Sequence, residues 1–342
     1  MGREELLRKI QETRQEIEPG QDVSIGLFRP EDAPGIAQAY YETYGPSFPL
    51  EHVYDPAEIV RRNATDAQHT LVARTSRGEV VGLIGLFRRA PNPEVYEIGQ
   101  LMVLRNYRMG NLATGLNAKA LNELPQRLQI PVVFGEAVSS HTVSQRLGRA
   151  CGSVFTGLEV ECMPSGAPAR EGGTQRNISL FLTCKVFRTS SCPVHLPEAY
   201  RAFCESIYAE LHLPRELLPP APLEGVTVEE REVIPACGLA RLSVRRCGAD
   251  FADAVATAEA SGQNAVQVIL SLGDPAAPSA VDLLRGRGYF LAGLLPCWFG
   301  PDALVLQKLR QEPDWEAIQV GGPEAESMRA VVRRDWERAR RG

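Results

Sequence analysis

The pattern of hydrophobic and polar positions between residues 23 and 164 predicts an alternation of strands and helices. Short apolar runs indicate strands, and apolar positions spaced three or four residues apart indicate helices. Pro30 and Asp55 suit the first turn and the N-cap of the helices that follow them. In chain order we expect strand Val23–Arg29, helices Ala33–Tyr44 and Pro56–Asn63, strands Thr70–Arg74, Glu79–Phe87 and Val95–Leu104, helix Asn111–Leu124, strand Val132–Val138, helix His141–Arg149 and strand Val154–Glu161.

The second half of the chain continues the alternation. Segment Ser165–Gln175 has the composition of a loop, and Pro214–Leu223, with four prolines, that of a linker. The expected elements are strand Ile178–Phe187, helix Glu198–Leu211, strands Val226–Val233 and Leu239–Arg245, helix Phe251–Ser261, strand Ala265–Leu272, helix Ala280–Arg287, and strands Leu291–Pro296 and Ala303–Leu309. The fold class is therefore α/β with a mixed sheet. The expected parts are an N-terminal helix (1–22), a first domain (23–164), a linker with a strand and a helix (165–223), a second domain (224–310) and a charged helical tail (311–342).

The segment Tyr107–Leu116 joins an apolar strand to a helix through a polar turn. In that layout, the unpaired N–H groups and partial positive charge of a helix N-terminus face an incoming phosphate. We expect Gly110 and Asn111 to supply the positive φ that such a turn often uses. Leu116 and Asn117 stand where a nucleoside-triphosphate-binding loop needs Lys and Ser or Thr, so the NTPase class is excluded.

The turn resembles motif A of the GCN5-related N-acetyltransferases (the GNAT superfamily), Gln/Arg-x-x-Gly-x-Gly/Ala. Arg108 and Ala113 match this pattern, and Asn111 replaces its first glycine. The resemblance implies a GNAT fold and direct transfer of acetyl from acetyl-CoA to a primary amine, without a metal. It also implies cofactor contacts at Leu101, Met102, Val103, Arg108, Met109, Gly110, Asn111, Leu112, Ala113 and Thr114.

Two glutamates are candidate catalytic bases. On strand alternation Glu97 shares a face with Val95, Gly99, Leu101 and Val103, so a carboxylate stands on an apolar face. Glu136 does the same in its strand. Burial would raise the pKa of such a carboxyl and make it a better base near neutrality. The alternative for each is an ion pair with an arginine, or a place at a strand end where the carboxylate meets water.

The general acid is not evident. Many GNAT enzymes use a tyrosine after the fifth strand, and the matching position here is Gly148. Either the thiolate leaves without a tyrosine acid, or His141 or Ser144, on the same predicted helix, assists.

The composition excludes several other classes of protein. The net charge is −5, without a basic stripe that would indicate nucleic-acid binding. No apolar run approaches the roughly 18 residues of a membrane span, and the charged start is unlike a secretory signal. The eight cysteines form no C-x-x-C pair, which predicts neither a metal site nor disulfides and favours a cytoplasmic protein.

Residues 224–310 resemble the back half of a second GNAT domain. Their turn, Cys247–Asp250, lacks the glycine pattern, and its aspartate would repel a pyrophosphate, so we expect no cofactor there. The chain is thus predicted to be an N-acetyltransferase that acts on a small-molecule or protein amine. The alternative is a non-catalytic acyl-CoA sensor that binds a regulatory protein partner through its C-terminal half. The sequence leaves a homodimer and the acyl length open.

Overall fold

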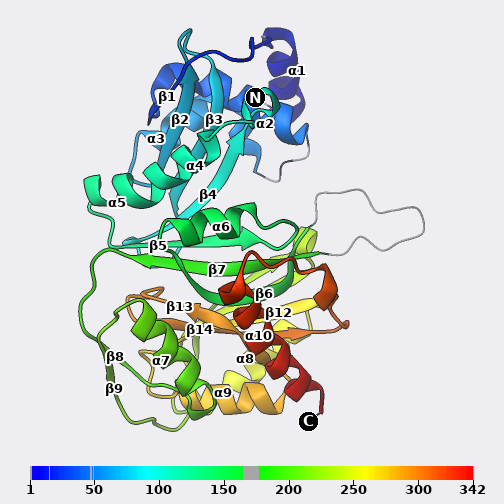
Figure 1. The fold of residues 1–342 in the computed structure, drawn as a ribbon. Helices are drawn as coiled ribbons and strands as arrows, with labels where there is room; N and C mark the ends of the chain where they lie inside the picture. Colours follow the sequence, from blue (N-terminus) through cyan, green and yellow to red (C-terminus); the bar gives the residue numbers. More distant parts are fainter. Residues whose placement is uncertain (1, 15, 47, 49, 165–176, 342) are drawn as a thin grey trace. The chain divides into compact units, whose positions relative to one another are not determined.

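The computed structural model describes residues 2–14, 16–46, 48, 50–164 and 177–341 (Figure 1). The expected loop Ser165–Gln175 lies outside these residues. The chain divides into two compact units. Unit 1 comprises Met1–Arg89 and Tyr96–Ile130, and unit 2 comprises Ala90–Val95 and Pro131–Gly342.

Unit 1 is built on an antiparallel sheet in the order β1-β2-β3-β4. Both faces of the central strands are buried, with Val72, Leu83 and Ile84 at most 2% exposed. The elements of unit 1 are α1 (Arg3–Thr13), β1 (Val23–Leu27), η1 (Pro30–Asp32), α2 (Ala33–Tyr44), η2 (Glu51–Tyr54), α3 (Pro56–Asn63), β2 (Gln68–Thr75), β3 (Val80–Arg88), β4 (Val95–Val103), η3 (Arg105–Tyr107), α4 (Leu112–Ala118), the π-helical turn η4 (Lys119–Glu123) and α5 (Leu124–Arg127). The predicted bounds of α2 and α3 are confirmed.

Strand β4 contains a β-bulge. Leu83 of β3 faces Met102, but Gly85 faces Gly99, so β4 carries one more residue than its partner between these pairs. Gln100 sits in the bulge with a φ of 59°, in the left-handed region. An extra residue reverses the alternation of faces beyond it. The expectation that Val103 shares the face of Glu97 is therefore wrong, and Met102 takes that place.

The predicted helix Asn111–Leu124 is observed as α4, the π-helical turn η4 and α5 in succession. This helical segment packs closely on the sheet at Gly115. A Cβ added to that glycine would lie 3.2 Å from Cδ1 of Ile25 on β1. The expected positive φ at the turn is wrong. Asn111 has a φ of −87°, and Gly110 is absent from the residues with positive φ. Asparagine in place of the first glycine of the motif therefore causes no backbone strain here.

Unit 2 contains a mixed sheet in the order β5-β7-β6-β13-β14-β12-β11-β10. Its elements are β5 (Val132–Val138), α6 (Val143–Ala150), β6 (Val154–Met163), β7 (Ile178–Val186), β8 (Cys192–Val194), η5 (Glu198–Tyr200), α7 (Arg201–Glu210), β9 (Arg215–Leu217), β10 (Val228–Ile234), η6 (Pro235–Cys237), β11 (Leu239–Arg246), α8 (Phe251–Glu259), β12 (Ala265–Ser271), α9 (Ala277–Gly286), β13 (Phe290–Leu295), β14 (Ala303–Leu309), η7 (Trp315–Ala317) and α10 (Pro323–Arg341).

The domain boundary expected at residue 164 differs from the structure. Strand β7, which the sequence assigned to a linker, pairs with both β5 and β6 and completes their sheet. Local patterning shows that a segment is a strand, but its partners are set by contacts distant in sequence.

Unit 2 contains the same arrangement twice. Strand β5, helix α6, strand β6 and a returning β7 between β5 and β6 are repeated as β12, α9, β13 and a returning β14. Strand β11 lies parallel to β12, with α8 as the crossover. The two copies adjoin where Gly157 of β6 faces Gly293 of β13. A Cβ at Gly157 would lie 2.3 Å from the carbonyl oxygen of Ala292, so the approach requires glycine.

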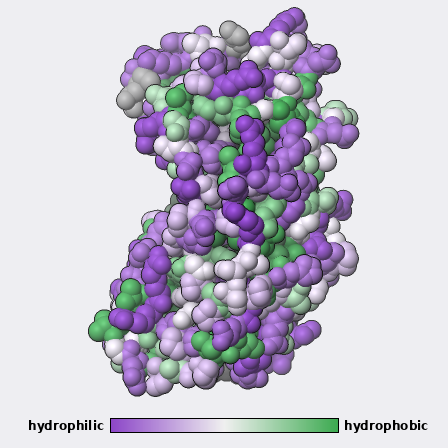
Figure 2. Space-filling model, turned by 90° about the vertical axis from the view of Figure 1, so that its left-hand side faces the viewer, coloured by the Kyte–Doolittle hydropathy of each residue, from purple (hydrophilic) through white to green (hydrophobic). Residues whose placement is uncertain are grey.

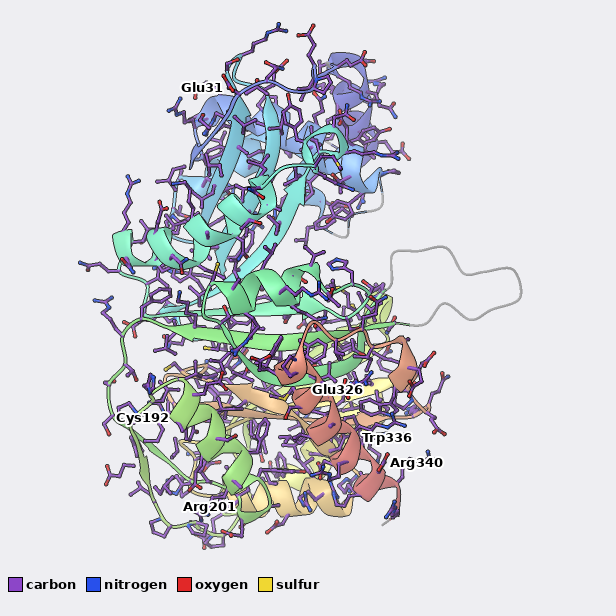
Figure 3. All side chains as sticks on the ribbon, viewed as in Figure 1. Glu31, Cys192, Arg201, Glu326, Trp336 and Arg340 are labelled. Atoms are coloured by element: carbon purple, nitrogen blue, oxygen red, sulfur yellow. The ribbon has the colours of Figure 1, made fainter. Side chains whose placement is uncertain are left out.

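Helix α10 packs against the rest of unit 2 through aromatic residues. The rings of Trp315 and Trp336 are 5.5 Å apart, and the Arg340 guanidinium lies 4.9 Å from the centre of the Trp336 ring. Figure 3 shows Trp336 and Arg340 close together on this helix. Two arginines of the predicted charged tail, Arg333 and Arg340, therefore make cation–π contacts.

The surface is mixed in polarity. On the face shown in Figure 2, hydrophilic residues predominate and hydrophobic ones form small patches. Within the described part of the chain, no helix has the length and apolar character needed to cross a membrane.

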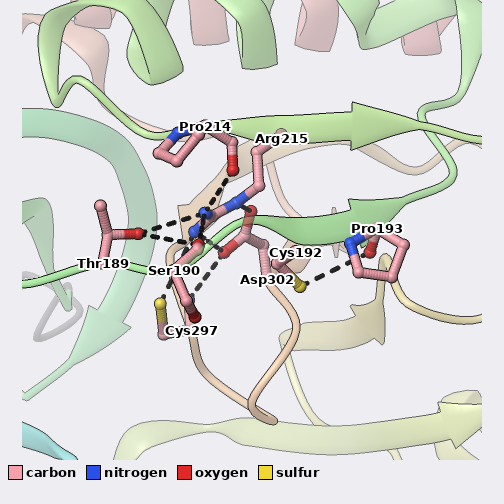
Figure 4. Close-up of polar contacts among 8 residues, drawn as sticks. All are labelled: Thr189, Ser190, Cys192, Pro193, Pro214, Arg215, Cys297 and Asp302. Carbon is pink, nitrogen blue, oxygen red and sulfur yellow. Dashed lines mark hydrogen bonds and ion pairs between the residues drawn. The ribbon is translucent and has the colours of Figure 1, made fainter.

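The short parallel strands β8 and β9, which the sequence did not predict, hold a buried ion pair (Figure 4). Arg215 of β9 donates to both carboxylate oxygens of Asp302, at 2.7 and 2.9 Å. Their side chains are 2% and 0% exposed. Asp302 also accepts from the backbone N–H of Cys297, so the carboxylate is well satisfied.

We predict that Asp302→Ala destabilises the protein by about 3–5 kcal/mol, because it leaves the Arg215 charge buried without its partner. Denaturant unfolding measures this. Glu198→Ala, which removes an exposed pair with Arg201, is the control and is expected to cost less than about 1 kcal/mol. Equal effects of the two substitutions would contradict the prediction.

Candidate functional site

The turn that the sequence singled out lies on the surface of unit 1. Arg108, Met109, Gly110 and Asn111 are exposed, and Met109 is 98% exposed. The turn follows η3 and leads into α4, so its backbone N–H groups stand at the start of a helical segment. Such a turn is accessible to an anionic ligand.

The structure joins this turn to the end of β4. Nε of Arg108 donates to the carbonyl oxygen of Val103 at 2.8 Å. Met102 and Val103 are buried and Leu101 is half-buried. The ten residues predicted to contact a cofactor therefore all lie in unit 1, on β4, the turn and the start of α4.

Glu97 lies on β4, where the side chain of Arg89 forms an ion pair with it at 3.2 Å. The alternative stated from the sequence, an arginine partner, is thus present. Glu97 faces Phe87 of β3, and Phe87 faces Gln68 of β2, so the three positions form a row across one face of the sheet.

The other predicted residues belong to unit 2. Glu136 is half-buried on β5, His141 is exposed just before α6, and the buried Oγ of Ser144 on α6 has no hydrogen-bond partner. The adjacent Gln145 is fully buried. Its Nε2 donates to the backbone carbonyl oxygens of Val138, His141 and Gln319, and its Oε1 accepts from the backbone N–H of Gly321. That network holds the start of α6 in place.

Unit 1 also contains a polar cluster that the sequence analysis missed. It surrounds a cavity of about 10 Å³ beside the β4 bulge, in a region otherwise lined by apolar residues. The polar members come from four different elements and are Tyr40, His52, Gln68, Thr70 and Gln100. The one sequence signal was the alternation of Gln68 and Thr70 on the inward face of a strand, whereas nothing marked His52.

A second missed group is the buried carboxyl of Glu159 on β6, which is 3% exposed. Burial raises its pKa, the charge of Arg241 opposes that rise, and the charge of Glu136 adds to it. Cys162 also donates to Glu159, at 3.6 Å. The raised pKa marks a titratable cluster in the core of unit 2.

In the second copy, the corresponding turn is Cys247–Asp250, just before α8, and its backbone N–H groups are bonded to other residues of the chain. The N–H of Cys247 donates to Asp274 at 2.6 Å, and that of Gly248 donates to Oγ1 of Thr227 at 3.0 Å. A Cβ at Gly248 would lie 2.4 Å from the backbone nitrogen of Thr227. Strands β11 and β12 pair in unbroken register from Leu239 to Val244. The donors that would hold a phosphate are therefore occupied.

Metal ligation finds no support among the residues that the structure describes. No three His, Cys, Asp or Glu side chains in that part of the chain are placed to hold a metal ion. The eight cysteines are free thiols.

The chain has a mixed α/β fold, and an exposed strand-to-helix turn lies in unit 1. Residues 34–152, roughly a third of the chain, match the model of the Acetyltransferase (GNAT) family, so the N-terminal half contains a GNAT acetyltransferase domain. The match extends across the division between the two units.

Several solved structures are similar to part of the chain. A GNAT-family acetyltransferase from Streptococcus pneumoniae is 16% identical with a TM-score of 0.40, covering 48% of this chain and all of that one. The spermidine N-acetyltransferase of Vibrio cholerae in complex with CoA and spermine is 16% identical with a TM-score of 0.38, covering 48% of this chain and 95% of that one. The ribosomal-protein-S5-alanine acetyltransferase of Vibrio fischeri is 12% identical with a TM-score of 0.40, covering 50% and 95%. No curated protein sequence matches the chain.

We predict that Glu159→Gln stabilises the protein more at pH 8 than at pH 5. A folded-state pKa above the ordinary value of 4.5 means that the wild type loses stability as the pH rises from about 4.5 through the folded pKa. The glutamine variant does not undergo this loss. The test is the difference in Tm between variant and wild type at the two pH values, and an equal difference at both would contradict the prediction.

Proposed function

We propose that the chain is an N-acetyltransferase that moves acetyl from acetyl-CoA to a primary amine by direct attack. The observation that carries this proposal is the exposed turn Arg108–Thr114 at the start of a helical segment, inside the region that matches the GNAT family. Backbone donors in such a turn suit a pyrophosphate. The bond from Arg108 to Val103 holds the turn against the end of β4.

The reaction places three demands on the protein. The amine must lose its proton before it attacks, the oxyanion that develops on the carbonyl must be stabilised, and the thiolate of CoA must leave and take up a proton. We assign the oxyanion donors to backbone N–H groups of Leu101–Val103. These groups belong to a strand, so they are fixed in place before the reaction begins.

The side chains proposed for proton transfer are those that the sequence singled out. Glu97 and Glu136 are candidate bases, and His141 and Ser144 are candidate acids. Ser144 suits such a role because its buried Oγ is unpaired in the free protein. The ion pair with Arg89 weighs against Glu97, since the guanidinium competes with a proton for the carboxylate.

A carboxylate placed in the turn tests the proposal. We predict that Met109→Asp weakens acetyl-CoA binding roughly tenfold, because a negative charge next to the pyrophosphate costs about 1 kcal/mol or more. Met109→Asn is the matched control, because asparagine is nearly isosteric with aspartate but uncharged. This variant should bind acetyl-CoA like the wild type. Met109 is 98% exposed, so neither change disturbs packing.

Thermal unfolding with and without acetyl-CoA gives the readout. Bound ligand at about 100 times its Kd should stabilise the wild type by roughly 2.7 kcal/mol. Equal Tm shifts with acetyl-CoA in Met109→Asp and Met109→Asn would show that the turn does not bind the pyrophosphate. Binding without release of CoA in the presence of amines would favour the acyl-CoA sensor over the enzyme.

We further predict that one acetyl-CoA binds per chain. The backbone N–H groups of Cys247 and Gly248 in the second copy donate to Asp274 and Thr227, so this turn offers no second phosphate site. Isothermal titration calorimetry measures the stoichiometry. Two equivalents with comparable affinity would contradict the interpretation of the second copy.

A further inference from the structure

We infer that the polar cavity beside the β4 bulge holds a water molecule that carries a proton from the acceptor amine to His52. This inference rests on the proposed function, since it assigns the proton acceptor of that same reaction. It replaces Glu97 in that role.

The size and the polar lining of the cavity suit a water molecule. Its volume of about 10 Å³ is close to the space that one water molecule needs. Gln68 is 8% exposed, its Nε2 donates to Thr70 at 3.1 Å, and its buried Oε1 has no hydrogen-bond partner. A buried acceptor without a donor is costly, and a water in the cavity would supply the missing O–H.

The cavity is attached to the part of β4 that the proposed function uses. The hydroxyl of Tyr40 donates to Oε1 of Gln100, the residue in the bulge. Gln100 immediately precedes Leu101, where the proposed oxyanion donors begin. Burial raises the pKa of Tyr40 well above its ordinary value, so its hydroxyl remains a donor at neutral pH. Gln100 thus connects the lining of the cavity to β4, the strand that carries the proposed oxyanion donors.

His52, on η2, forms another part of the lining. Burial lowers its pKa, and the charges of Arg62 and Arg61 lower it further, against an opposing effect of Glu58. The remaining titratable group that lines the cavity, Tyr40, is uncharged at neutral pH. At pH 7 the imidazole is neutral and has a lone pair available for a proton.

The proton transfers balance. The acceptor ammonium gives one proton through the water to His52, and the neutral amine attacks the thioester carbonyl. The C–N bond forms, the C–S bond breaks, and the second nitrogen proton passes to the departing thiolate. His52 then releases its proton to solvent, so the sum is an amide, CoA thiol and one proton.

Unit 1 offers a matched control in His69. This histidine is also half-buried with a pKa lowered by burial, but it lies between Gln68 and Thr70 on β2 and therefore faces the other side of the sheet. There its ring stacks on Tyr96, with ring centres 5.8 Å apart. A general effect of replacing a half-buried histidine would appear in both positions, whereas loss of the proton acceptor would appear in one.

The experiment measures CoA release from acetyl-CoA against pH, with a panel of polyamines, aminoglycosides and lysine-containing peptides, for the full chain and its variants. We expect His52→Gln to lower kcat/KM about 100-fold at pH 7. It should also abolish the fall in kcat/KM at acid pH while acetyl-CoA still shifts the Tm. His69→Gln should retain the wild-type profile. Gln68→Leu, which keeps the bulk but removes the acceptor, should lower kcat without changing the KM for acetyl-CoA, and it replaces His52→Gln if that variant does not fold.

The outcomes separate the two proposals. A wild-type pH profile in His52→Gln, or the same loss in Glu97→Gln alone, overturns the role of His52 and leaves the acetyltransferase in place. A wild type that neither binds acetyl-CoA nor releases CoA overturns both. An equal loss in His52→Gln and His69→Gln shows a structural effect and also overturns the inference.

Discussion

The extra residue in β4 is the constraint on which the candidate site depends. Gln100 adopts a left-handed conformation, and the alternation of side chains reverses at that point. Met102 therefore takes the face of Glu97, and Val103 turns to the face covered by α4, where a Cβ at Gly82 would meet both Val103 and Leu116. The same bulge brings Gln100 to Tyr40. Bulges are common next to active sites because they redirect side chains without unravelling a sheet.

In unit 2 the topology is repeated, but the backbone donors of the turn before α8 are bonded within the chain. Strand pairing and helix packing are preserved from β11 to β14, and the core residues Val268, Leu270 and Leu306 are fully buried. The backbone N–H groups of Cys247 and Gly248 donate instead to the side chains of Asp274 and Thr227, and that of Ala249 donates to the carbonyl oxygen of Gly225. Buried or half-buried N–H groups need partners, so a turn without a ligand gains stability by acquiring internal acceptors.

Much of the fold was predictable because strand and helix periodicity is a local property. The bounds of α2, α3, β5 and β14 agree with the prediction. The insertion of β7 between β5 and β6 was not predictable, since Ile178–Val186 reads as a strand in any position. Strands β8 and β9 were missed because three residues are too few for a pattern. The candidate cofactor turn could be proposed from the sequence because its residues lie within one short segment.

The sequence alone determined the elements, the resemblance of the turn to motif A, and the absence of that motif from the second copy, because each depends on neighbouring residues. The tertiary structure decided which side chains meet. It paired Glu97 with Arg89, buried Glu159, and gathered His52, Gln68 and Gln100 from separate elements around one cavity. Side-chain contacts across a sheet depend on register, and a single inserted residue in β4 changes the register in a way that no local pattern records.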